Sequence, residues 1–324
     1  MKIFINDKET EVLADKPLIE SMRAQGYHVP SMCYASNANH QASCMVCMVK
    51  DCRTGQMIPS CSTLPTEGMR IETDTEEVLK LRRMSLELLL SDHRADCEAP
   101  CTQVCKNDLD PARILLYYDR GQLSEARTLL LQQGDTIPCL ECSKTPCEKA
   151  CRRRTVDSNV SIRDIFVSLA KDTSIPLVDK ELLPFGGGGR GASKLGRYSS
   201  DEIEWLKTEY DQPSRCLHCA CEGRDKCKLR QYASEAQIKS IPYSVTSALP
   251  VKQQIVVNGR LRFEPAKCIR CGLCVYNTED GFTFLGRGFN MQVVIPEDSK
   301  QHVPESICEL CPTGALFLVD PPTP

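Results

Sequence analysis

Cysteines dominate the chemistry that this sequence could support. The chain has 21 of them among 324 residues, and they fall into tight groups at 33–61, 97–105, 139–151, 216–227 and 268–311. An odd number of clustered thiols does not suit a disulfide framework, which would also need an oxidising compartment. Grouped thiolates in a cytosolic chain are typical ligands of zinc or of iron–sulfur clusters. The sequence therefore predicts bound metal, with iron–sulfur favoured over zinc.

The composition suits a chain that is held together by metal as well as by apolar packing. Hydrophobic residues make up 41% of the sequence only because the cysteines are included, aromatic residues make up 6%, and Trp205 is the single tryptophan. A formal net charge of −3 argues against a nucleic-acid partner. The chain has neither a signal-peptide pattern nor an apolar run of about 20 residues that could span a membrane. We therefore expect a cytoplasmic protein.

The first cysteine group lies among predicted strands and a helix. Alternating apolar and polar residues at 2–6 and 10–13 predict a hairpin, and residues 17–25 read as a helix. Further strands are predicted at 47–50 and 69–72. This order predicts an α+β chain that begins with a β-grasp ferredoxin domain.

That domain, residues 1–75, carries a spacing of C-x10-C-x2-C-x13-C. Four thiolates at such positions can hold a [2Fe–2S] cluster. Cys52 competes with the last ligand but lies in a polar turn. The spacing resembles the N-terminal domain of the largest peripheral-arm iron–sulfur subunit of respiratory complex I, and of related hydrogenase and formate dehydrogenase subunits. The predicted [2Fe–2S] ligands are Cys33, Cys44, Cys47 and Cys61.

Residues 76–170 predict a helical domain with two cysteine runs. Helices are expected at 75–90, from Pro111 onward and at 124–133. The runs offer seven thiols and the His93 imidazole, which is enough for two [4Fe–4S] clusters.

The pieces PCTQVC, GQLSEA, PCEKACRR and VSIRD resemble the iron–sulfur domain of the glutamate synthase small subunit and of dihydropyrimidine dehydrogenase. The resemblance implies that each cluster takes ligands from both runs. His93 and Cys97 depart from that family, which has a close cysteine pair there. The implied ligand sets are His93, Cys97, Cys101 and Cys151 for one cluster, and Cys105, Cys139, Cys142 and Cys147 for the other.

Residues 171–200 read as a glycine-rich linker. Gly186, Gly188 and Gly191 formally fit G-x-G-x-x-G, but no strand is expected before them and no helix within them, so a nucleotide site is not predicted. The segment 201–248 begins with a short helix and continues into a run spaced C-x2-C-x-C-x5-C. This run suits either zinc or a [4Fe–4S] cluster, and we favour the cluster. Its predicted ligands are Cys216, Cys219, Cys221 and Cys227.

The last segment, 249–324, resembles a degenerate bacterial ferredoxin. Asn258-Gly259 predicts a hairpin ahead of the run CIRCGLC. In bacterial ferredoxins the fourth cysteine of such a run serves a second cluster, but Thr278 stands there, so only one cluster is expected. Cys308, like Cys52, is spare. The predicted [4Fe–4S] ligands are Cys268, Cys271, Cys274 and Cys311.

These sites predict an electron-transfer chain with one [2Fe–2S] and about four [4Fe–4S] clusters. The sequence predicts no catalytic residue. Arg152–Arg154 are predicted to form a basic surface whose positive charge compensates the negative charge of the clusters. The resemblances imply a subunit that is not catalytic alone. It would relay single electrons between an NAD(P)H-linked flavoprotein and another redox subunit of a complex I-like, hydrogenase, formate dehydrogenase or glutamate synthase-like assembly. The alternatives are a zinc or iron–sulfur interaction scaffold and a redox sensor.

Metal analysis tests this count directly. Anaerobically purified protein should contain about 18 iron atoms per chain and an equal amount of acid-labile sulfide. The measurement is a colorimetric iron and sulfide assay together with elemental analysis. A preparation that contains mainly zinc and no sulfide would contradict the iron–sulfur prediction.

Overall fold

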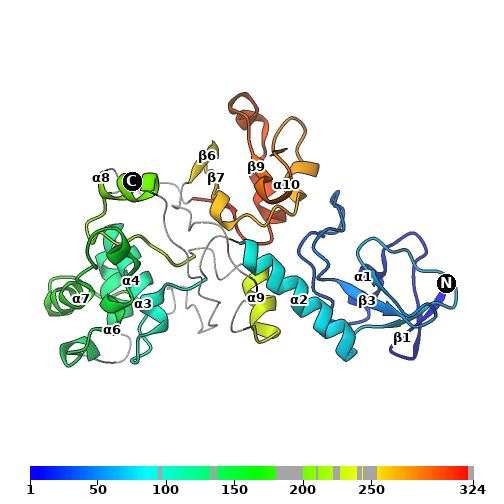
Figure 1. Ribbon diagram of the computed structural model, residues 1–324, viewed down its shortest axis with the longest axis horizontal. Coiled ribbons are helices and arrows are strands. Elements are labelled where there is room, and N and C mark those ends of the chain that lie inside the picture. Colours follow the sequence, from blue (N-terminus) through cyan, green and yellow to red (C-terminus); the bar gives the residue numbers. More distant parts are fainter. Residues whose placement is uncertain are drawn as a thin grey trace. The chain divides into compact units, whose positions relative to one another are not determined.

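The computed structural model divides into two compact units (Figure 1). The first contains Met1–His93, Lys226–Ser244 and Lys252–Pro324, and the second contains Arg94–Asp225 and Val245–Val251. The second unit is thus inserted in the sequence of the first. The predicted linker glycines at 186–191 lie outside the described residues. The structure describes residues 1–93, 97–131, 134, 137–179, 200–208, 211–221, 227–238, 243 and 254–319.

The first unit begins with a five-stranded sheet in the order β2-β1-β5-β3-β4. β1 and β5 pair in parallel, and the other neighbours are antiparallel. Helix α1 (Leu18–Ala24) contributes Leu18, Ile19 and Met22 to the core that also holds Ile3 and Ile5. The strands are β1 (Lys2–Ile5), β2 (Lys8–Glu11), β3 (Met48–Asp51), β4 (Gln56–Pro59) and β5 (Arg70–Glu72).

The predicted hairpin, helix and later strands are confirmed, with one shift and one omission. The hairpin turns at Asn6 and Asp7, whose φ angles of 49° and 62° suit a two-residue turn, so its second strand starts earlier than expected. Strand β4 was not predicted, because residues 56–59 (QMIP) do not alternate between apolar and polar. In the structure Gln56 is exposed and the next three residues are partly buried. It extends the sheet beside β3.

Two helices from distant parts of the sequence pack together in the first unit, α2 (Glu76–Asp92) and α9 (Lys228–Glu235) (Figure 1). The Thr75 hydroxyl accepts a hydrogen bond from the Val78 N–H at 3.3 Å and caps α2. Leu86 and Leu90 share a buried core with Leu229. The insertion therefore separates two helices of one packed unit.

The C-terminal part of the first unit contains two small sheets. One has the order β10-β7-β6, and the other pairs β8 with β9. The predicted Asn258-Gly259 hairpin is confirmed, and Gly259 has φ 49°. The elements are β6 (Ile255–Asn258), β7 (Leu261–Phe263), α10 (Leu273–Tyr276), β8 (Thr283–Leu285), β9 (Gln292–Val294) and β10 (Leu316–Leu318), with short 3-10 helices at Pro265–Lys267, Gly288–Asn290, Glu297–His302 and Glu305–Leu310.

The second unit is helical. Asp110 caps α4 by accepting from the Arg113 N–H at 3.3 Å, and Pro111 occupies the first turn, as predicted. Ile114 and Phe166 are fully buried in the core of this unit. Among the described residues, no helix is long and apolar enough to cross a membrane. The helices are α3 (Pro100–Gln103), α4 (Pro111–Asp119), α5 (Leu123–Leu130), α6 (Pro146–Lys149), α7 (Ile162–Lys171) and α8 (Ser200–Thr208), with 3-10 turns at Pro138–Leu140 and Arg152–Thr155.

A buried ion pair lies directly after strand β7 in the C-terminal part of the first unit. The Lys267 ammonium is 2.8 Å from a carboxylate oxygen of Glu264, and these side chains are 2% and 0% exposed. The ammonium also lies 4.9 Å from the centre of the Phe317 ring. Removing one partner of such a pair leaves the other charge buried without compensation.

Glu264→Gln should therefore lower the free energy of unfolding by about 3–5 kcal/mol. Anaerobic urea denaturation followed by circular dichroism would measure the loss as a lower midpoint. Glu9→Gln is the matched control, because it removes an exposed partner of Lys2 and should leave the curve unchanged. Equal curves for the parent and Glu264→Gln would show that the buried pair does not contribute.

Candidate metal centres

The four cysteines predicted to hold a [2Fe–2S] cluster come together in the first unit. Cys33, Cys44, Cys47 and Cys61 are at most 7% exposed. Hydrogen bonds from the thiols of Cys44 and Cys61 lower the pKa of Cys33, and a bond from Cys61 lowers the pKa of Cys47 to about 6. The same contacts raise the pKa values of Cys44 and Cys61. Cys52 is exposed, whereas Cys61 is fully buried with the other three cysteines of this group.

Polar side chains hold the loops that carry these thiols. The Ser60 hydroxyl donates to the Cys47 carbonyl at 2.7 Å. The Nε2 atom of His40 lies 3.1 Å from the Cys61 carbonyl oxygen, which it can reach only as a donor. These contacts hold the backbone at Cys47 and Cys61, while the segment from 33 to 47 is largely irregular. Neither positioning residue was singled out from the sequence.

A second group of thiols forms in the C-terminal part of the first unit. Burial raises the pKa values of Cys268, Cys271 and Cys274 to about 12, and the charge of Cys311 adds to each shift. The Arg270 N–H donates to the Cys268 sulfur at 3.3 Å, and the Leu316 N–H donates to the Cys311 sulfur at 3.4 Å. Amide hydrogen bonds to sulfur are a feature of iron–sulfur sites, where they help to set the reduction potential of the cluster.

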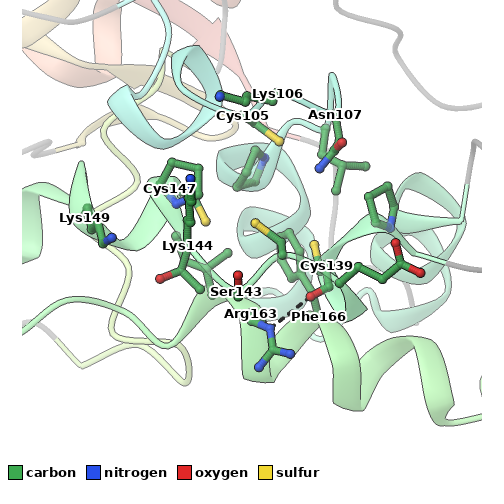
Figure 2. Close-up of a pocket in the computed structure, with 18 residues that line it drawn as sticks. Cys105, Lys106, Asn107, Cys139, Ser143, Lys144, Cys147, Lys149, Arg163 and Phe166 are labelled. Atoms are coloured by element: carbon green, nitrogen blue, oxygen red, sulfur yellow. Dashed lines mark hydrogen bonds between the residues drawn. The ribbon is translucent and has the colours of Figure 1, made fainter.

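A third group lines a cavity of about 590 Å³ in the second unit. Figure 2 shows the sulfur atoms of Cys105, Cys139 and Cys147 turned towards this space. Burial is the main cause that raises the pKa of Cys139 to about 11 and that of Cys147 to about 12, and the charge of Cys105 contributes to both. Cys142 lines the same cavity. These are the four ligands that the resemblance implied for one cluster.

Basic side chains surround this cavity. Lys106, Lys144, Lys149 and Arg163 all line it, and among its described lining residues Glu141 is the one carboxylate. The guanidinium of Arg163 donates to the carbonyls of Cys139 and Leu140 at 3.0 and 3.1 Å, so α7 holds the turn that carries Cys139 (Figure 2). A cavity with thiol donors and a cationic wall fits an anionic cluster.

The remaining predicted donors divide between the units. His93 and Cys227 belong to the first unit, while Cys97, Cys101, Cys151, Cys216, Cys219 and Cys221 belong to the second. The Nε2 atom of the buried His93 lies 3.2 Å from the Lys267 carbonyl oxygen. Cys227 begins α9 and is buried in the core that contains Cys33.

Single metal ions need tighter donor sets than clusters do. Within the described ranges, no group of three or more His, Cys, Asp or Glu side chains is arranged to hold one metal ion. In the second unit, Cys101 and Cys216 lie in one buried core, and Cys151 and Cys219 pack against it. From the sequence, Cys101 and Cys151 were expected in one ligand set, and Cys216 and Cys219 in another.

The comparison with protein families decides the nature of the first domain. Residues 1–76 match the family model described as a 2Fe-2S iron-sulfur cluster binding domain. The first domain is a [2Fe–2S] domain. The chain is also similar to the NADP-reducing hydrogenase subunit HndD of Solidesulfovibrio fructosivorans, at 31% identity over 163 residues, which is 47% of this chain and 27% of that protein. The predicted resemblance to this class of subunit is confirmed.

A respiratory NADH dehydrogenase subunit is similar as well. The mitochondrial NADH-ubiquinone oxidoreductase 78 kDa subunit of Candida albicans is 27% identical over 125 residues, which is 39% of this chain and 17% of that protein. The predicted resemblance to complex I is therefore confirmed too. In both relatives the matched region spans only a small part of the relative's own length, 27% and 17%.

A solved structure has a similar fold. It is the crystal structure of NAD+-reducing [NiFe]-hydrogenase in the H2-reduced state, and one of its chains matches with a TM-score of 0.51 and 14% identity, covering 98% of this chain and 86% of that chain. The likeness concerns the fold alone. The resemblances of the middle and C-terminal segments to glutamate synthase and bacterial ferredoxin domains stay predictions.

The cavity of the second unit gives a matched pair of variants. Cys142→Ala should lose about four iron atoms and four sulfides per chain, because one thiolate ligand of a [4Fe–4S] cluster is removed. Ser143→Ala changes the neighbouring residue in the same cavity lining and should keep the full iron content. Equal iron in both variants, measured after anaerobic reconstitution, would mean that Cys142 is no ligand.

Proposed function

We propose that this chain relays single electrons inside a larger oxidoreductase, between an NAD(P)H-linked flavoprotein and another redox subunit. Bound iron–sulfur clusters supply one-electron chemistry, with potentials set by ligand type, hydrogen bonds to sulfur and burial. The names of the relatives, an NADP-reducing hydrogenase subunit and an NADH-ubiquinone oxidoreductase subunit, support this class of assembly. The proposal includes one [2Fe–2S] cluster, about four [4Fe–4S] clusters and a cytoplasmic location.

The observation that carries the proposal is a core shared by two thiol groups of the first unit. Cys33 and Cys44 lie in a buried cluster together with Leu86, and Cys271 packs against that cluster. Burial is the main cause that raises the pKa of Cys271, and the charge of Cys33 is the smallest of the contributing causes. The rate of electron tunnelling falls steeply with distance. Clusters held by neighbouring thiol groups would therefore exchange electrons readily.

Backbone and amide contacts join the loops that carry these groups. The Asn39 N–H donates to the side-chain oxygen of Asn277 at 2.9 Å, and the Asn277 amide donates back to the Asn39 carbonyl at 2.8 Å. The Asn39 amide also donates to the Tyr276 carbonyl at 3.2 Å. Reciprocal bonds of this kind fix the separation of the two loops, which lie 238 residues apart in sequence.

Apolar side chains fill the space around this contact. Met32 is 1% exposed and Val46 is fully buried, and Ile269 packs against the same cluster. Packed side chains exclude water and hold their neighbours at constant positions. Because the neighbouring atoms move little when a cluster gains or loses an electron, the reorganisation energy of each transfer is small. A small reorganisation energy suits repeated one-electron transfer.

Magnetic coupling tests whether the two groups exchange electrons. In the fully reduced full-length protein, the [2Fe–2S] EPR signal should be split or broadened by the spin of the C-terminal centre. Cys271→Ala should remove about four iron atoms and convert that signal to a simple, uncoupled one. Cys52→Ala is the control, because Cys52 is an exposed thiol of the same domain, and it should match the parent.

The same preparations separate a relay from a scaffold or a sensor. Proteins that co-purify with the tagged chain should contain flavin, and NAD(P)H should bleach the clusters only when those proteins are present. An uncoupled [2Fe–2S] signal in the parent would overturn direct exchange between the two groups. A flavin-free assembly that NAD(P)H does not reduce would overturn the NAD(P)H-linked relay.

A further inference from the structure

We propose that Cys101, Cys151, Cys216 and Cys219 form one [4Fe–4S] site in the second unit. This set differs from the sets expected from the sequence, where Cys101 and Cys151 were joined with His93 and Cys97, and the other two with Cys221 and Cys227. It draws its ligands from three separate segments of the second unit. The proposal rests on the iron–sulfur content of the chain, not on its partners.

Burial brings the four thiols to one place. Cys101 and Cys216 are each 8% exposed and belong to one core with Ile114 and Phe166. Cys151 and Cys219 are partly buried and pack against that core, as do Cys105, Cys139 and Cys147. Those last three line the cavity together with Cys142. The cysteines of this core that do not line the cavity are Cys101, Cys151, Cys216 and Cys219.

A buried carboxylate fixes the loop that carries two of the thiols. The side chain of Asp119, at the end of α4, is 1% exposed. The Ser214 N–H and hydroxyl donate to its two oxygens at 2.7 and 2.6 Å, and the His218 Nε2 atom lies 2.9 Å from one of them. The carboxylate therefore holds residues on both sides of Cys216.

The backbone of this loop is bent towards sulfur. Arg215 and His218 both have left-handed φ angles, 62° and 45°. The His218 N–H donates to the Cys216 sulfur at 3.3 Å. Left-handed backbone is costly for residues with a side chain and persists where the surroundings enforce it, often at functional sites. Here the His218 amide hydrogen points to a thiol, as amides do in iron–sulfur sites.

A second carboxylate ties this loop to the segment that follows Cys151. Asp157 accepts two hydrogen bonds from the Arg153 guanidinium, both at 2.8 Å, and one from Arg215 at 2.8 Å. Arg153 is 4% exposed and lies two residues after Cys151. Arg215 directly precedes Cys216. The bidentate pair and its bridge therefore hold Cys151 and Cys216 on the same side of the unit.

Iron counts in a double variant distinguish the two partitions. Cys101→Ala and Cys216→Ala should each lose about four iron atoms per chain, and the double variant should lose no more than about four, because both changes remove the same cluster. Under the sequence-based partition the double variant would lose about eight. The double variant Cys142→Ala/Cys216→Ala should lose about eight under both partitions and shows that such a loss is measurable.

Serine variants guard against misfolding. Single changes to Ser at positions 101, 151, 216 and 219 should all alter the same [4Fe–4S] EPR signal, while the [2Fe–2S] signal stays as in the parent. A loss of about eight iron atoms in the first double variant, or alteration of two different signals by the serine variants, would overturn the proposal. Zinc bound to these thiols in the parent, in place of iron, would overturn it too.

Discussion

Thiols from segments far apart in the chain are buried together in this protein, and each is costly to ionise there unless a metal compensates its charge. Cys33 and Cys61 are fully buried, and Cys101 and Cys216 lie in a core with Phe166. The sheet and helices around them are short, and the aromatic content is 6%. Metal–thiolate bonds of the kind proposed here would supply folding free energy that apolar packing alone provides in larger cores.

Side-chain oxygens and amides do most of the positioning around these thiols. Asp119 and Asp157 hold irregular segments of the second unit, while Ser60, His40 and the Asn39–Asn277 pair hold those of the first. Segments without a regular hydrogen-bond ladder must satisfy their polar groups by such local contacts. The chain thus uses short loops at its cysteines and lets single polar residues fix each loop.

Local signals in the sequence were sufficient for many elements. Pro111 and Asn258-Gly259 gave a correct helix start and a correct turn, because the chemistry of helix starts and turns depends on adjacent residues. The resemblance to the glutamate synthase iron–sulfur domain also implied the group at Cys105, Cys139, Cys142 and Cys147, which line one cavity. It could not reveal that Cys216 and Cys101 share one buried core, because the loop that carries Cys216 is held by Asp119 and Asp157, whose partners are distant in sequence. Nothing near either aspartate marks it as an anchor.

The insertion of residues 94–225 into the first unit affects the order in which the chain can fold. A ribosome releases the second unit almost complete before it has made α9 or Cys271, and domains that emerge first generally fold first. Met32, Cys33 and Leu86 must wait for Leu229 and Ile269, which belong to the same core. During synthesis the N-terminal thiols are therefore not yet covered by the side chains that bury them in the folded protein. Iron and sulfide must be delivered either while this site is still exposed to solvent or after the chain is released.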